Sequence, residues 1–375
     1  MTLDWHTADF PELRAAPPWV MEEMIHAQAA LPPGIAAAAG VGPLRATVER
    51  VVAAGDEVVV AGCGTSEHAA RLIATLLGEA VRGIGIGRVR ARQSLDVAFD
   101  PPPAGLVIGV SHDGGTRATK LALDAARAAG VATAAITARA DGAVAAAAEL
   151  VLVTPILDRS WCHTVAYSSA ILAGAALAHG GEGWEEAAAA TLATTLADPA
   201  AREAGRRLHP AQRIVTAGLG TDLVAARELA LKIEEGARIA ATAHHLETLL
   251  HGHLAASEAT GTRIVLVGGD ETLGDRHHRR FLLVAQAVAE IGIPTTAIAA
   301  GDLADGLPDA VDVVRLPSAD HGPLGRLLGV LATSVAIQLA TLGLVDAAGT
   351  NPDLIRREQD AYRAAAAVGD ESTDW

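Results

Sequence analysis

Short apolar runs alternate with longer, alanine-rich stretches along most of the chain. An apolar run of about four to eight residues between glycines and polar turns is typical of a buried strand, and apolar residues three and four apart predict a helix. Strands that alternate with helices form parallel sheets that are covered on both faces. The pattern therefore predicts an α/β fold. The expected strands are 106–110, 132–137, 150–154, 264–267, 295–299 and 311–316, together with the runs that begin at Val58 and Ile214.

The pattern occurs twice, which indicates an internal repeat. Gly-x-Gly-Thr follows the first apolar run at residues 62–65 and again at 218–221. The second apolar run of each copy leads into a polar turn that ends in a threonine, Thr116 or Thr272. Two tandem α/β domains are therefore expected. The predicted division is an N-terminal arm at 1–40 that holds a helix at 20–30, a first domain at 41–190, a second at 205–348, and a polar, partly helical tail at 349–375 that lies on a partner surface.

The composition narrows the class of protein. The 375 residues include 44 Asp and Glu against 29 Lys and Arg, a net charge of −15, and no long run rich in Lys or Arg, which argues against nucleic-acid binding. The start of the chain lacks a basic stretch before an apolar core, and Gly, Arg or His residues break the longest, alanine-rich apolar stretches short of a membrane span. Two cysteines make no disulfide framework. We therefore expect a cytoplasmic protein that binds neither nucleic acid nor a membrane.

Two loops that follow strands carry candidate ligand-binding groups. Residues 111–119 lie between a strand and a helix, where backbone N–H groups and hydroxyls can form a site for an anion. Residues 62–66 form a second loop at the same carboxyl edge of the sheet, the edge at which open α/β sheets bind ligands. Ordinary turns with helix N-caps are the alternative. The matching character of the two loops favours a ligand site.

The helical stretch after Gly220 carries three charged residues on one face. Glu228, Lys232 and Glu235 are spaced i, i+4 and i+7, and most other positions are apolar, so we expect a buried helix. Buried charges need partners or a chemical task. This pattern leaves open both an internal ladder of ion pairs and a catalytic group.

Four histidines and one glutamate gather at residues 244–253. The ligand spacing of known metal motifs is absent, so the pattern predicts no metal site. For His251, a surface position beside a turn is the alternative to a functional role.

Together these motifs resemble the sugar isomerase (SIS) family, and within it the isomerase half of glucosamine-6-phosphate synthases. The matching positions are the loops 62–66 and 111–116, then Glu228, Lys232 and Glu235, then His251 and Gly252. The resemblance extends from Trp19 to Asp360. It implies two tandem flavodoxin-like SIS domains in a homodimer, which binds a sugar or sugar phosphate in sites shared between subunits and needs no cofactor. Since Thr2 follows Met1, where the family's glutaminase half needs a cysteine, we expect that half to be absent.

The resemblance also implies roles for individual residues. Glu235 matches the base that moves a proton between C1 and C2 of the open-chain sugar, and Lys232 matches a lysine near the sugar. His251 matches a histidine that opens the sugar ring and that typically reaches into the neighbouring subunit's site; Glu247, one helical turn earlier, is placed to orient it. The residues expected to hold the sugar or its phosphate are Gly64, Thr65, Ser66, Ser111, His112, Asp113, Gly115, Thr116, His163 and Arg356.

The chain departs from the family pattern at four places. Asp113 replaces a serine of the phosphate loop, so either its carboxylate turns away or the ligand is not a simple phosphate. His163 replaces a serine beside the sugar, with packing at a helix start as the alternative. The family's tail lysine falls on Asp360, although Arg356 is retained, so no imine can form there. His253 stands where a proline usually follows His-Gly.

We therefore expect an enzyme that acts on an open-chain sugar or amino-sugar derivative by proton transfer at C1 and C2. Such an enzyme is an aldose–ketose isomerase, or a related deaminase or deglycase. A sugar-phosphate sensor without catalytic activity is the alternative. Retention of Glu235 together with His251 favours the enzyme.

Overall fold

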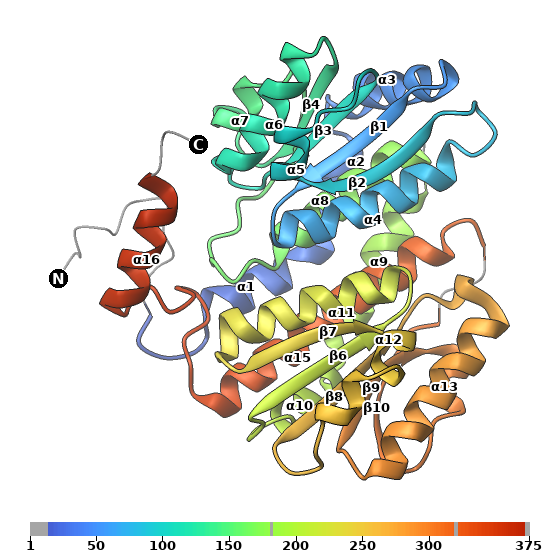
Figure 1. Cartoon of the computed structure of the whole chain (residues 1–375), viewed down its shortest axis with the longest axis vertical. Helices are drawn as coiled ribbons and strands as arrows, with labels where there is room; N and C mark the ends of the chain where they lie inside the picture. The colour runs from blue at the N-terminus through green and yellow to red at the C-terminus, as the bar shows by residue number, and fades with distance from the viewer. Residues whose placement is uncertain (1–13, 181–182, 319–321, 372–375) are drawn as a thin grey trace.

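The structure, a computed structural model, describes residues 14–180, 183–318 and 322–371. It contains two parallel sheets of five strands, which lie one above the other in the view of Figure 1. The orders β2-β1-β3-β4-β5 and β7-β6-β8-β9-β10 are both the flavodoxin-like one, so the predicted tandem α/β fold is confirmed. The strands are β1 (Glu57–Gly62), β2 (Arg88–Gln93), β3 (Leu106–Val110), β4 (Ala132–Thr137), β5 (Leu150–Val153), β6 (Arg213–Gly218), β7 (Ala240–His245), β8 (Thr262–Gly268), β9 (Thr295–Ala300) and β10 (Val311–Leu316).

Helices cover both faces of each sheet. On one face they pack into a single core that extends through both halves of the molecule, and on the other face each sheet has a smaller core of its own. The helices of the shared core are α1 (Val20–Ala27), α2 (Leu31–Ala36), α3 (Val41–Ala53), α4 (Thr65–Ala80), α8 (Val165–His179), α9 (Trp184–Ala197), α10 (Ala200–Arg207), α11 (Thr221–Lys232) and α15 (Gly325–Ala348). Those of the smaller cores are α5 (Ser94–Phe99), α6 (Arg117–Ala128), α7 (Ala143–Ala146), α12 (Leu246–Leu250), α13 (Gly274–Ile291) and α14 (Gly301–Asp305).

Short turns of helix complete the chain. Three are 3-10 turns, η1 (Gln28–Ala30), η3 (His253–Ala256) and η4 (Glu271–Leu273), and one, η2 (Ile233–Ala237), is a π-helical turn that continues α11. The last helix, α16 (Asp360–Glu371), lies at the side of the molecule in Figure 1.

The N-terminal segment and the tail pack against each other. The carboxylate of Asp353 accepts the backbone N–H groups of Val20 and Met21, each at 2.8 Å, and so caps α1 from the far end of the chain. Both capped residues are fully buried in the shared core. Residues 1–13 of the predicted arm and residues 372–375 of the predicted tail lie outside the described residues.

One expectation from the sequence is wrong. We expected every apolar stretch to fall short of a membrane span, but α15 has 24 residues and is long and apolar enough to cross a membrane by length and composition. In the structure, 94% of its most apolar window is buried. Its apolar surface packs inside the protein as the longest helix of the shared core.

Candidate functional site

The two predicted loops meet at the carboxyl edge of the first sheet, because β1 and β3 are neighbours in that sheet. Together with residues from the second half and the tail they enclose a cavity of about 270 Å³, called the site cavity below. Its lining residues are Cys63, Gly64, Thr65, Ser66, His112, Asp113, Thr116, Trp161, His163, Ala166, Glu235, Ile355 and Arg357.

The first loop is fixed by glycine and by a bond to the second half. Gly64 has a φ of +55°, which favours glycine, and leads into α4. At the start of this helix, Thr65 Oγ1 donates a hydrogen bond of 3.0 Å to the carboxylate of Glu228 on α11. The helices α4 and α11 face each other between the two sheets (Figure 1). The floor of the site cavity therefore joins the two halves of the chain.

The second loop bonds to its own aspartate. Asp113 Oδ1 accepts hydrogen bonds from Ser111 Oγ at 3.2 Å and from the backbone N–H of Gly115 at 3.0 Å. Ser111 is fully buried, and its Oγ also lies 2.9 Å from Thr116 Oγ1. Of the two alternatives that the sequence offers for Asp113, a carboxylate that turns away from the loop is not the one found, because Asp113 bonds to the loop itself.

Two histidines on the cavity wall have opposite charge preferences. His112 Nε2 accepts the backbone N–H of Asp158 at 2.8 Å, so the neutral ring carries its proton on Nδ1, and burial lowers the pKa of His112 to about 4. His163 Nδ1 lies 3.8 Å from the Asp158 carboxylate. Burial alone lowers the pKa of His163, but the Asp158 carboxylate outweighs it and raises that pKa above 6.5. His112 is therefore neutral at neutral pH, and His163 keeps its positive charge to a higher pH than an ordinary histidine.

Asp158 holds this part of the wall in place. Its carboxylate accepts the backbone N–H groups of Ser160, Thr164 and Ala166 at 3.1, 2.7 and 3.1 Å, across the loop that starts α8. Asp158 is buried, which raises its pKa, yet the neighbouring His163, His112 and the N–H of Thr164 bring the pKa below its ordinary value. The carboxylate is therefore ionised, and it positions His163.

Glu228, Lys232 and Glu235 form a chain of charges from α4 to the site cavity. Lys232 is fully buried; its Nζ lies 3.6 Å from Glu228 Oε1 and donates a hydrogen bond to Glu235. Burial lowers the pKa of Lys232, but the carboxylates of Glu235 and Glu228 outweigh it and raise that pKa above 10.5. The ammonium is therefore charged and does not act as a nucleophile at neutral pH. The predicted ion-pair ladder exists, and its last member, Glu235, lines the site cavity.

Glu235 reaches the cavity through an irregular turn. It lies in the π-helical turn η2, where α11 widens before it ends, and its side chain is 23% exposed. Such turns are rare and occur frequently at functional sites.

The tail closes the site cavity with a residue that the sequence did not single out. Ile355 and Arg356 have φ angles of +40° and +68°, so the chain turns sharply here. As a result Arg357 lines the site cavity, with its guanidinium 4.6 Å above the ring of Trp161. Arg356 instead stacks 4.1 Å above the ring of Tyr362 and lines a neighbouring cavity of about 370 Å³ that shares Glu235.

His251 lies elsewhere in the described chain. It follows α12 in the second half, its side chain is 77% exposed, and it is absent from the lining of the site cavity. Its Nε2 lies 3.3 Å from a carboxylate oxygen of Glu247, as expected for an orienting partner.

Most of the predicted site residues are brought together. The site cavity is lined by Gly64, Thr65, Ser66, His112, Asp113, Thr116, His163 and Glu235, whereas Ser111, Gly115, Lys232, Arg356 and His251 are not among its lining residues. Ser111 and Gly115 belong to the second loop, and Lys232 lies directly behind Glu235. Arg357 lies one position after the predicted Arg356, and nothing in the residue pattern marks the turn at Ile355 that brings it to the cavity.

The described residues contain no group of three or more His, Cys, Asp or Glu side chains that could hold a metal ion. In the histidine cluster of the second half, His244 and His253 stack on each other with ring centroids 3.9 Å apart.

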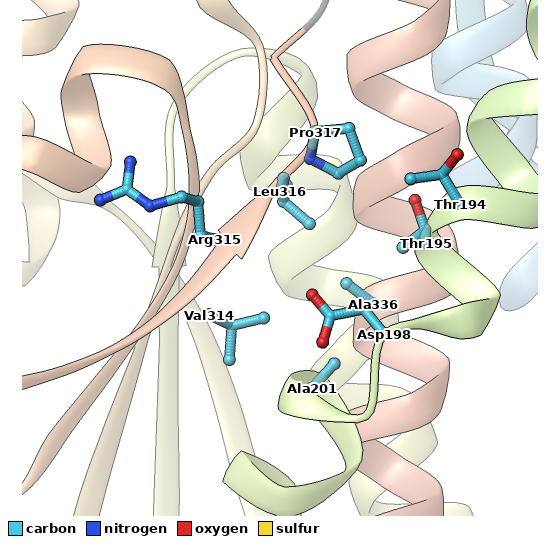
Figure 2. A pocket seen from close by; sticks show the side chains of 9 residues that line it. All are labelled: Thr194, Thr195, Asp198, Ala201, Val314, Arg315, Leu316, Pro317 and Ala336. Carbon is cyan, nitrogen blue, oxygen red and sulfur yellow. The ribbon is translucent and has the colours of Figure 1, made fainter.

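A second hollow, of about 340 Å³, lies between α9, α15 and the end of β10 (Figure 2). It is lined by Thr194, Thr195, Asp198, Ala201, Val314, Arg315, Leu316, Pro317 and Ala336. Figure 2 shows the guanidinium of Arg315 pointing away from Thr194 and Thr195, and it pairs with Asp305 at 2.7 Å. The predicted site residues do not line this hollow, so the site cavity is the candidate functional site.

Residues 53–179 match the sequence model of the SIS domain family. None of the curated proteins matches the chain. Among solved structures, the C-terminal domain of glucosamine-fructose-6-phosphate aminotransferase from Francisella tularensis is similar with a TM-score of 0.73 and 16% identity, over 91% of this chain and 99% of that one. Tagatose-6-phosphate ketose/aldose isomerase from Escherichia coli has a TM-score of 0.74 and 20% identity, over 92% and 97%.

Glucosamine-6-phosphate deaminase from Thermotoga maritima has a TM-score of 0.66 and 18% identity, over 89% of this chain and 97% of that one. At such low sequence identities, the structural similarity shows a shared fold. This similarity extends over both halves of the chain. Residues 53–179 thus match the SIS domain family, and the second half of the chain repeats the fold of that segment.

Proposed function

We propose that the chain is a sugar isomerase-type enzyme that moves a proton between C1 and C2 of an open-chain sugar or amino sugar in the site cavity. The observation that carries the proposal is the position of Glu235, whose carboxylate lines this cavity and is held from behind by the buried Lys232. A carboxylate at hydrogen-bond distance of a carbon-bound proton next to a carbonyl is the usual base for such a transfer.

The other wall groups suit the remaining needs of the reaction. His163, whose pKa the Asp158 carboxylate raises, serves as a hydrogen-bond donor to the sugar oxygen that gains negative charge. The neutral His112 accepts the backbone N–H of Asp158 and so holds the loop beside His163. Lys232 is a positioning residue for Glu235, and its charge makes imine formation unsuitable. Deamination or deglycation of an amine-bearing sugar begins with the same proton transfer, so these reactions are variants of the proposal.

The proposal includes a homodimer. The exposed His251 lies outside the site cavity of its own chain, so the ring-opening role implied by the resemblance requires a second copy that brings its His251 to this cavity. In a two-fold dimer the same contact occurs twice, which gives two shared sites.

Hydrogen exchange tests the proton transfer directly. Candidate sugars and amino sugars are incubated with the protein in deuterated water, and label at C1 or C2 is measured by NMR. We expect label with the wild-type protein and its loss in Glu235→Gln, which keeps the shape of the side chain. The matched control is Glu234→Gln: the neighbouring Glu234 is exposed and bonds only to the backbone N–H of Ala241 among the described residues.

Two results would contradict the proposal. If Glu235→Gln keeps the wild-type exchange rate, Glu235 is not the base. If a sugar binds and no label enters, the chain is a sensor of sugars and not an enzyme.

Complementation tests the shared site. Glu235→Gln and His251→Ala are each expected to be inactive alone. When equal amounts are unfolded and refolded together, half of the dimers contain one of each chain and one intact site, so about a quarter of the wild-type activity should return. Activity of His251→Ala alone, or no recovery in a mixture that forms dimers, would contradict a shared site.

A further inference from the structure

The loop that resembles a phosphate site already holds a negative charge. Asp113 Oδ1 accepts hydrogen bonds from Ser111 Oγ and from the Gly115 N–H. A hydroxyl and a backbone N–H at the start of a helix are the donors that such a loop offers to a phosphate. In this chain both donors bind the carboxylate of Asp113.

The hydroxyls of this loop also bond among themselves. Ser111 is fully buried, and its Oγ lies within hydrogen-bond distance of Asp113 and of Thr116 Oγ1 and accepts the Thr116 N–H at 3.4 Å. A ligand could use the Ser111 hydroxyl only after the Asp113 carboxylate had left. A phosphate placed beside that carboxylate would face a like charge, which disfavours its binding.

The part of Asp113 that remains for a ligand is an acceptor. Asp113 is exposed and lines the site cavity, and its Oδ2 accepts no hydrogen bond from the described residues. An oxygen of this kind binds hydroxyl or ammonium groups, which donate hydrogen bonds, and not the oxygens of a phosphate.

We propose that the substrate is an unphosphorylated open-chain sugar or amino sugar, whose hydroxyl or ammonium group at this end binds Asp113 Oδ2. That the bound sugar is a substrate rests on the proposed function. The preference of the second loop for a hydrogen-bond donor over a phosphate does not depend on catalysis. The second loop is thus a site for a sugar end that carries no phosphate.

Binding of inorganic phosphate tests the loop without reference to any reaction. Phosphate affinity of the whole protein is measured by calorimetry and by thermal shift for the wild type, for Asp113→Ser and for Asp124→Asn. The last variant removes one exposed carboxylate from α6, outside the site cavity, and is the charge-matched control. We expect at least about tenfold tighter phosphate binding in Asp113→Ser and a change of less than about twofold in the control.

Exchange assays with pairs of sugars test the substrate class. Glucose, glucosamine and their 6-phosphates are compared as substrates of the wild-type protein and of Asp113→Ser. We expect the wild type to exchange the unphosphorylated sugar with the higher kcat/KM, and the order to reverse in the variant. A preference of glucosamine over glucose identifies an ammonium as the donor, and the opposite preference a hydroxyl; both agree with the inference.

Three outcomes would overturn it. They are wild-type phosphate binding as tight as that of Asp113→Ser, a wild-type preference for the phosphorylated sugar, and phosphate binding by the wild type that Arg357→Gln abolishes, since Arg357 is the other cation on the cavity wall. Exchange of no sugar at all sinks the proposed function alone, because the phosphate titration still reports on the loop.

Discussion

Lys232 is the residue whose loss should be most costly to the fold and the site together. In Lys232→Met a side chain of similar length replaces a fully buried ammonium that pairs with Glu228 and Glu235. Glu228 is 1% exposed and would remain as a buried carboxylate without its main cation. Removing one partner of a buried ion pair costs about 3–5 kcal/mol of unfolding free energy. Since Thr65 and His68 still bond to Glu228, we expect a value at the lower end, about 3 kcal/mol.

The loss of unfolding free energy in Lys232→Met should be larger at neutral than at acidic pH. In the wild type, burial raises the pKa of Glu228, but Lys232 and His68 outweigh it and bring the pKa below 4.5. A carboxylate with a lowered folded pKa adds stability above its unfolded pKa, and this stability is lost as pH falls through the folded value. Without Lys232 the folded pKa of Glu228 rises. The difference in unfolding free energy between the wild type and Lys232→Met is therefore largest near neutral pH and decreases toward pH 4.5.

Urea denaturation followed by circular dichroism measures the difference at neutral and acidic pH. The chain offers a matched control, because its only other lysine, Lys120, is 43% exposed and pairs with Asp124 on α6. Lys120→Met should cost at most about 1 kcal/mol. A loss below about 1 kcal/mol for Lys232→Met, or a loss that grows toward acidic pH, would refute the reasoning. Restoration by Glu228→Gln in the same chain would support it, because the unpaired charge is then gone.

Three further predictions follow from the site. In His163→Gln the pH profile of kcat/KM should lose its alkaline limb, which the pKa of His163 sets above 6.5 because of Asp158; a variant that keeps this limb contradicts the donor role. Cys162 is buried and its thiol pKa is raised, so it should resist alkylation by iodoacetamide in the folded protein, whereas Cys63 on the cavity wall should react and be protected by a bound sugar. Mass spectrometry measures the labelling, and equal labelling of both cysteines contradicts this expectation. Gly62→Ala should cost about 1–3 kcal/mol in urea denaturation, because the new Cβ would lie 2.4 Å from backbone atoms at the start of α4; an unchanged midpoint contradicts the close approach.

The strands that form continuous apolar runs could be predicted from the sequence, and two polar edge strands, β2 and β7, could not. The central strands β3 and β4 are buried on both faces and appear as continuous apolar runs. β2 has an arginine at every second position, and β7 ends in two histidines. Each lies at the edge of its sheet and has one neighbouring strand, so polar side chains face the solvent without loss of core. The apolar pattern therefore misses these two edge strands, whereas it finds the edge strands β5 and β10, whose sequences are more apolar.

The site could be predicted in part for a similar reason. Loops between strands and helices are fixed by the sheet, so the positions of Gly64 and Thr116 follow from the order of the strands. The choice between Arg356 and Arg357 depends on two consecutive positive φ angles, which no turn residue announces because neither position is glycine or asparagine. The bonding of Asp113 to its own loop is likewise a matter of side-chain direction, which residue spacing does not determine.

The two halves of the chain contribute different groups to the site cavity. Asp222 stands in the second half where Ser66 stands in the first, and its carboxylate accepts the N–H groups of Gly269 and Asp270 at 2.9 and 3.1 Å. These N–H groups begin the loop after β8, the counterpart of the loop after β3. Burial, and then the charge of Asp270, raise the pKa of Asp222.

The carboxylate of Asp222 is 2% exposed and cannot leave its donors without unpacking the core, whereas the carboxylate of Asp113 is exposed and keeps its Oδ2 accessible to a ligand. The second half has therefore closed its own loop to anions and contributes in another way, through Glu228, Lys232 and Glu235 on α11 and η2. The first half contributes the two loops that line the site cavity. Neither half alone contains both the proposed base Glu235 and the two loops that line the site cavity, so the proposed reaction requires both halves.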